Sequence, residues 1–143
     1  MEIRAAEPAD VAALEPLFAQ WSHPLGPEDL ASQVRRWRDT PSAELRVAVI
    51  DGEIAGMVAI AAVPRLGEVG YAARLTGLVV GDHHRRRGVG RALVDDVTAL
   101  ARTWGCDRVE LTSSRARDAA HAFYVALGYR ETSAEQARYV RSL

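Results

Sequence analysis

The sequence feature that most constrains the fold is an apolar stretch, followed by a basic turn with glycines, over residues 78–91. Leu78-Val79-Val80 predicts a buried strand, and a helical pattern begins beside Gly88 and Gly90. Glycine lets backbone N–H groups approach a ligand without a Cβ in the way. A helix N-terminus adds unpaired N–H groups and a positive dipole end. The segment therefore predicts a cradle for a phosphate or pyrophosphate, with a solvated turn as the alternative.

Three arginines, Arg85, Arg86 and Arg87, precede the first of these glycines and add positive charge suited to an anion. The dinucleotide-binding fingerprint needs a third glycine, but Leu93 stands at that position. The nucleoside-triphosphate loop needs a lysine, and all 18 basic residues of the chain are arginine. Both of these phosphate-binding motifs are therefore excluded.

Helical and strand periodicities alternate along the rest of the chain. Asp51-Gly52 is a strong hairpin signal between two of the predicted strands. The order strand-helix-helix-strand-strand-strand-helix-strand-helix-strand predicts an α/β fold with a mixed sheet and helices on both faces. We expect strands at residues 3–6, 45–50, 54–63, 72–80 and 108–112, one or two more within 129–143, and helices at 7–20, 27–38, 89–104 and 118–127.

Length and composition predict one domain over residues 1–143, with ordinary proportions of hydrophobic (48%) and charged (26%) residues. A net charge of −1 argues against binding to nucleic acid or to an anionic membrane. The single cysteine, Cys106, excludes an internal disulfide, and no His or Cys pair has zinc-site spacing, so no metal is expected. The chain shows neither a secretion signal at its start nor an apolar run of roughly 20 residues, so we expect a cytoplasmic protein.

Two segments carry a resemblance to a known family. Arg85, Gly88 and Gly90 fit the short arginine-and-glycine signature of the GNAT acetyltransferase superfamily, and Leu78-Val79-Val80 stands before it as that family's fourth strand does. Residues 119–129, Ala-Ala-His-Ala-Phe-Tyr-Val-Ala-Leu-Gly-Tyr, resemble a second segment of the family. The resemblance implies a mostly antiparallel central sheet with a splayed parallel pair of strands.

The resemblance also implies acetyl-CoA as co-substrate. Its pyrophosphate would lie on the amides of residues 86–91, and its pantetheine arm would lie beside the predicted strand, where an N–H near Val80 would polarise the thioester carbonyl. Tyr124 matches the family's general acid, with core packing as the alternative reading. The implied cofactor-binding residues are Leu78, Val79, Val80, Arg85, Arg86, Arg87, Gly88, Val89, Gly90, Arg91 and Arg117.

The sequence departs from the family pattern around the expected site. Arg117 stands where many relatives have an asparagine that contacts the cofactor. Some relatives carry a glutamate base at the positions of Thr112 or Arg74, and neither residue is a base here. Arg74 could instead favour an amine that also carries a carboxylate. Glu110, Glu68, His83 and water stay open as candidate bases.

The resemblance therefore implies an N-acetyltransferase. It would transfer the acetyl group of acetyl-CoA to a primary amine of a small molecule or peptide, by direct attack in a ternary complex. The alternative is a CoA-binding or sensing module that kept the fold and lost catalysis. Neither nucleic acid nor membrane is an expected partner, and a homodimer is expected because dimers are common in the family.

Overall fold

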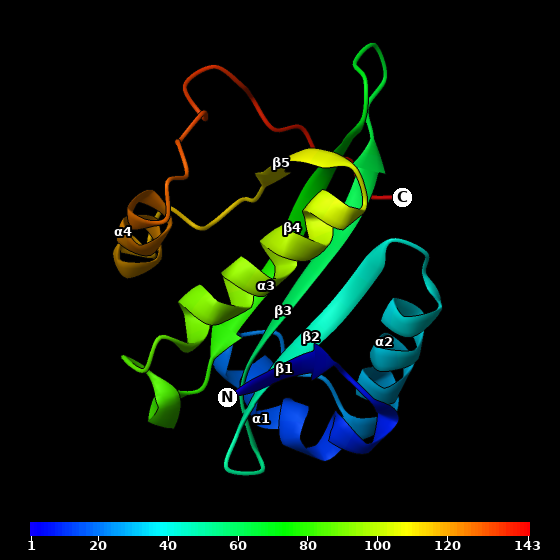
Figure 1. Cartoon of the computed structure of the whole chain (residues 1–143), viewed down its shortest axis with the longest axis vertical. Coiled ribbons are helices and arrows are strands. Elements are labelled where there is room, and N and C mark those ends of the chain that lie inside the picture. The colour runs from blue at the N-terminus through cyan, green and yellow to red at the C-terminus, as the bar shows by residue number, and fades with distance from the viewer. The chain divides into compact units, whose positions relative to one another are not determined.

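A five-stranded sheet in the order β1-β2-β3-β4-β5 forms the framework of the first part of the chain (Figure 1). Neighbouring strands are antiparallel from β1 to β4, whereas β5 is parallel to β4, so the predicted mixed sheet is confirmed. The computed structural model describes all of residues 1–143, which divide into two units, residues 1–111 and 112–143. The strands are β1 (Glu2–Ala5), β2 (Ala43–Ile50), β3 (Glu53–Pro64), β4 (Tyr71–Val80) and β5 (Cys106–Glu110).

Four α-helices and two short 3-10 turns complete the secondary structure. Pro27 begins the second helix, where its missing N–H costs nothing, and Gly105 follows the third helix in a left-handed conformation with φ 80°. The predicted helices are thereby confirmed within a few residues at each end. The elements are η1 (Pro8–Asp10), α1 (Val11–Gln20), α2 (Pro27–Asp39), η2 (Asp82–His84) and α3 (Val89–Thr103) in the first unit, and α4 (Asp118–Ala126) in the second.

Helices cover both faces of the sheet in the first unit, as predicted. On one face, Leu14 of α1 and Leu30 of α2 are fully buried against a cluster that includes Val47 of β2. On the other face, α3 buries Leu93 and Val97. The middle strand of the sheet, β3, therefore lies between α1 on one face and α3 on the other.

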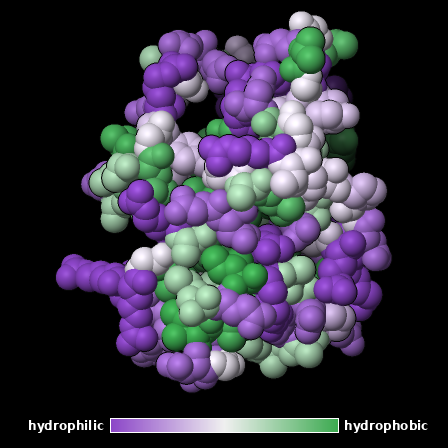
Figure 2. Space-filling model, viewed as in Figure 1, coloured by the Kyte–Doolittle hydropathy of each residue, from purple (hydrophilic) through white to green (hydrophobic).

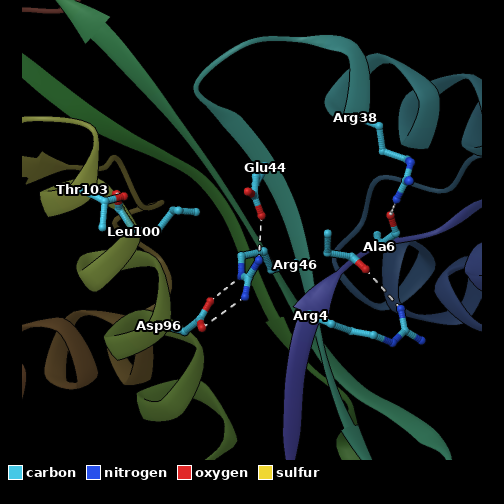
Figure 3. A network of polar contacts seen from close by, with 9 residues as sticks. Arg4, Ala6, Arg38, Glu44, Arg46, Asp96, Leu100 and Thr103 are labelled. Atoms are coloured by element: carbon cyan, nitrogen blue, oxygen red, sulfur yellow. Dashed lines mark hydrogen bonds and ion pairs between the residues drawn. The ribbon is translucent and has the colours of Figure 1, made fainter.

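A polar network ties α3 to the sheet (Figure 3). Arg46 of β2 pairs with Asp96 of α3 through its Nε, and its second guanidinium nitrogen lies 3.3 Å from the other carboxylate oxygen. The same guanidinium donates to Glu44 at 2.7 Å. The three side chains are half-buried, and each charge has a partner of opposite sign, which keeps the cost of burying them low.

The strands expected within residues 129–143 do not form. After Gly128 the chain forms only one turn, at residues 133–135, where Glu135 N–H donates to the Thr132 carbonyl at 2.9 Å. Residues 130–138 are mostly polar, so they lack the alternating apolar face that would hold a strand against a core. The side chain of Arg115 instead bonds Glu131 at 3.1 Å and Ser133 at 2.8 Å.

Hydrophilic residues dominate the face shown in Figure 2, and hydrophobic residues show in smaller patches, one of them at the tip of the β3–β4 hairpin. At that tip Leu66 and Val69 are fully exposed. The ionic contacts of Arg65 with Glu68 and Asp107 hold the hairpin against the start of β5. None of the helices has the length and apolarity needed to cross a membrane.

Candidate functional site

The turn after β4 adopts an unusual backbone conformation. Directly after β4, the Gly81 N–H donates to the Ala55 carbonyl oxygen of β3 at 2.8 Å, and η2 follows. Arg86 and Gly88 then both take left-handed conformations, with φ of 62° and 74°. A non-glycine residue with positive φ stores strain, and such residues concentrate where a backbone must be aimed at a ligand.

The N-terminus of α3 leaves backbone N–H groups without partners in the helix. No side chain caps it, because glycine stands at the N-cap position, and the first intrahelical bond runs from Ala92 N–H to Gly88 at 3.0 Å. The N–H groups of Val89, Gly90 and Arg91 precede that bond and have no partner within the helix. The buried Val89 side chain fixes the first turn, while the side chains of residues 85–87 are exposed around it. This is the arrangement that the sequence predicted for a phosphate cradle.

The outer edge of β4 is open beside this cradle. Pairing with β5 stops at Arg74 and Glu110, so the last six residues of β4 have no strand partner on that side within the first unit. Because Gly81 N–H bonds towards β3, alternation turns the backbone groups of Leu78 and Val80 away from β3. The parallel pairing of β4 with β5 confirms the predicted parallel pair, and β5 ends at Glu110 while β4 continues to Val80.

Gln20, a residue that sequence reasoning missed, occupies part of this edge. Its side-chain amide donates to Val80 C=O at 2.8 Å and accepts from Asp82 N–H at 3.1 Å. No sequence signal could have found it, because the contact joins residues sixty positions apart. Next to the cradle, the N–H of Val80 and both backbone groups of Leu78 have no strand partner on this edge.

The second unit holds Tyr124 on α4. Its ring makes edge contacts with Phe123 and Tyr129, with centroids 5.3 and 5.6 Å apart. Burial raises the pKa of the Tyr124 hydroxyl above its ordinary value, and the positive charge of Arg117 opposes this by a smaller amount. Tyr124 is therefore held in its protonated form at neutral pH, and Arg117 lies close enough to stabilise the phenolate.

The candidate bases lie at different places in the first unit. Glu68 sits in the β3–β4 hairpin and pairs with Arg65, at the opposite end of β4 from Val80. Glu110 ends β5 where the strands part and pairs with Arg108 at 2.9 Å. His83 is exposed in η2, and Arg74 lies opposite Glu110 in the sheet register.

A cavity of about 440 Å³ lies elsewhere in the first unit. It opens between the end of α2, the start of β2 and the end of α3, with Trp37 and Trp104 in its walls. None of the residues predicted to bind the cofactor lines it, so this cavity is distinct from the cradle. The structure also contains no group of three His, Cys, Asp or Glu side chains that could hold a metal ion.

Comparison of the sequence with known protein families agrees with the fold described above. The sequence model of the Acetyltransferase (GNAT) family matches residues 11–129, which is most of the chain and extends into both units. The chain therefore belongs to the GNAT acetyltransferase family. The resemblance seen in the sequence is confirmed.

Two curated relatives, N-acetyltransferase family 8 member 7 and member 3 of Mus musculus, are each 34% identical to this chain over 106 residues. The aligned region covers 73% of this chain and 46% of each relative, so the chain spans about half the length of these proteins.

Solved structures share the fold over the whole chain. A putative acetyltransferase from Agrobacterium tumefaciens str. C58 has a TM-score of 0.87 at 24% identity, covering 99% of this chain and 100% of that one. Ribosomal-protein-alanine N-acetyltransferase from Brucella melitensis biovar Abortus 2308 has a TM-score of 0.79 at 20% identity, covering 100% of both chains. These likenesses confirm the predicted GNAT fold class.

Proposed function

We propose that this protein is an acetyl-CoA-dependent N-acetyltransferase that acts on a primary amine of a small molecule or peptide. The observation that carries the proposal is the open β4 edge followed directly by the uncapped N-terminus of α3. One long ligand with an amide-containing arm and a pyrophosphate can use both features at once. Membership of the family supports the same chemistry.

In this proposal the pyrophosphate accepts hydrogen bonds from the N–H groups of the first α3 turn, and the neighbouring arginines neutralise its charge. The pantetheine arm lies along β4 and bonds the free backbone groups of Leu78 and Val80. The left-handed backbone at Arg86 and Gly88 supports this role, because it turns the chain sharply between the strand and the helix. The binding residues are those expected from the sequence, Leu78, Val79, Val80, Arg85, Arg86, Arg87, Gly88, Val89, Gly90, Arg91 and Arg117.

The reaction proceeds by direct attack of the neutral amine on the thioester carbonyl carbon. The Val80 N–H stabilises the negative charge that develops on the carbonyl oxygen. As the carbon–sulfur bond breaks, Tyr124 donates its proton to the leaving thiolate. The amine gives up its own proton to water, or to Glu110 or His83, and solvent reprotonates the tyrosine.

The surroundings of Tyr124 support its assignment as the acid. A raised pKa keeps the phenol protonated, and Arg117 stabilises the phenolate formed when the proton leaves. The amine acceptor is supported by the names of relatives, which include N-acetyltransferases and a ribosomal-protein-alanine N-acetyltransferase. A single domain over residues 1–143, a homodimer and a cytoplasmic location stay predictions.

Release of free thiol from acetyl-CoA, measured over a panel of small amines and peptides, tests the proposal. For an accepted amine we expect Tyr124→Phe to lower kcat by about 100-fold or more while its affinity for acetyl-CoA is unchanged. Tyr129→Phe is the matched control, since it removes a neighbouring phenol hydroxyl, and it should retain activity. Tight acetyl-CoA binding without release of thiol for any amine would favour a binding or sensing module instead.

A further inference from the structure

The end of α1 contacts β4 at two points. Gln20 binds the strand end, as described above, and Trp21 lies against Gly77, three residues earlier. A Cβ on Gly77 would lie 2.7 Å from the Trp21 ring, so the glycine is what lets the indole approach the strand. The Trp21 contact holds the end of α1 in place, so Gln20 gives up less conformational freedom when it bonds the strand.

Gln20 acts at the corner where the β4 edge becomes the loop of the cradle. The peptide group between Val80 and Gly81 is held from both sides, because its N–H bonds Ala55 at 2.8 Å and its C=O accepts from Gln20 at 2.8 Å. The next peptide group donates its N–H to the same Gln20 side chain at 3.1 Å. Both peptide groups of the corner are therefore fixed by one half-buried side chain.

We infer that Gln20 is a positioning residue that holds the β4 edge and the α3 cradle in register, so that one ligand can bind both. This inference rests on the proposed function. A ligand that spans the corner gains from the fixed geometry, because its second contact then forms without further ordering. A ligand that touches only the strand edge or only the cradle gains nothing from it.

Calorimetric titration of the full chain with three ligands tests this inference. Acetyl-CoA spans the corner, S-acetyl-pantetheine can reach only the strand edge, and ADP can reach only the cradle. We expect Gln20→Met, which keeps the side-chain length and removes both hydrogen bonds, to weaken acetyl-CoA binding about tenfold. The same substitution should change the affinity for each short ligand by less than about twofold.

A control variant sharpens the result. Gln33→Met on α2 is the matched control and should bind all three ligands like wild type.

Equal weakening of all three ligands, or unchanged acetyl-CoA binding in a folded Gln20→Met variant, would overturn the positioning role while leaving the proposed function standing. A wild-type protein that binds none of the three ligands would overturn the proposed function, and the inference with it.

Discussion

At the scale of single residues, the charged groups that the fold buries are held by partners of opposite charge. Asp10 is the only charged residue in the fully buried class. Arg4 donates to both of its carboxylate oxygens, at 2.7 and 2.9 Å, and Glu7 N–H adds a bond of 2.8 Å. The hydrogen bonds from Arg4 hold the pKa of the Asp10 carboxyl below its ordinary value, against the opposing effect of burial.

Asp10 should make the free energy of unfolding depend on pH. Because its pKa is lowered in the folded state, Asp10 contributes stability above its unfolded value of about 4 and loses that contribution as pH falls through the native pKa. We expect Asp10→Ala to lower the free energy of unfolding by about 2 kcal/mol at pH 7. The difference from wild type should shrink below about pH 4, as measured by urea unfolding at several pH values.

Glu15→Ala is the control for this experiment, since it removes an exposed carboxylate from α1. It should change stability by less than about 0.5 kcal/mol at either pH. A loss for Asp10→Ala that is the same at pH 3 and pH 7 would show that the carboxylate charge is not what stabilises the native state.

At the scale of elements, the close approach of β3 to its neighbours depends on Gly56. A Cβ at this position would lie 2.8 Å from the Val79 carbonyl oxygen of β4 and 3.1 and 3.2 Å from Leu93 and Val89 of α3. The backbone oxygen cannot swing aside as a side chain can. Strand and helix must therefore move if any side chain is added here.

We expect Gly56→Ala to lower the free energy of unfolding by about 1–3 kcal/mol, the usual cost of overpacking a core. Gly26→Ala is the control, because nothing lies within 4 Å of a Cβ at that position and its backbone angle is ordinary. The two variants are compared by chemical unfolding. Equal midpoints would mean that β3 and α3 are not packed as closely as the structure has them.

Most elements, and the strand-turn-helix arrangement of residues 78–103, could be predicted from the sequence because local patterns encode them. The apolar strand, the glycines and the helix of residues 78–103 are all contiguous in the chain. The contact of Gln20 with Val80 could not be predicted, since it depends on how α1 packs on the sheet. The prediction of strands within residues 129–143 was wrong, because the polar residues 130–138 leave only a short apolar ending around Tyr139 and Val140.

At the scale of the whole molecule, the absence of lysine has a chemical consequence. All 18 basic residues are arginine, so a preparation of residues 1–143 carries no side-chain amine that could accept an acetyl group. Incubated with acetyl-CoA alone, it should gain at most one stable acetyl group, on its N-terminal amine, by intact-mass spectrometry. Several stable additions would show that the acceptor chemistry is not confined to amines.

The central claim is that the loop between β4 and α3 binds acetyl-CoA, and calorimetric titration of three proteins tests it most directly. Gly90→Glu places a negative charge in the first turn of α3, whereas Gly26→Glu places the same charge at the start of α2, in open space. We predict micromolar binding to wild type and to Gly26→Glu, and binding at least about 100-fold weaker to Gly90→Glu. Absence of binding to folded wild type, or equal binding to the two glutamate variants, would contradict the account.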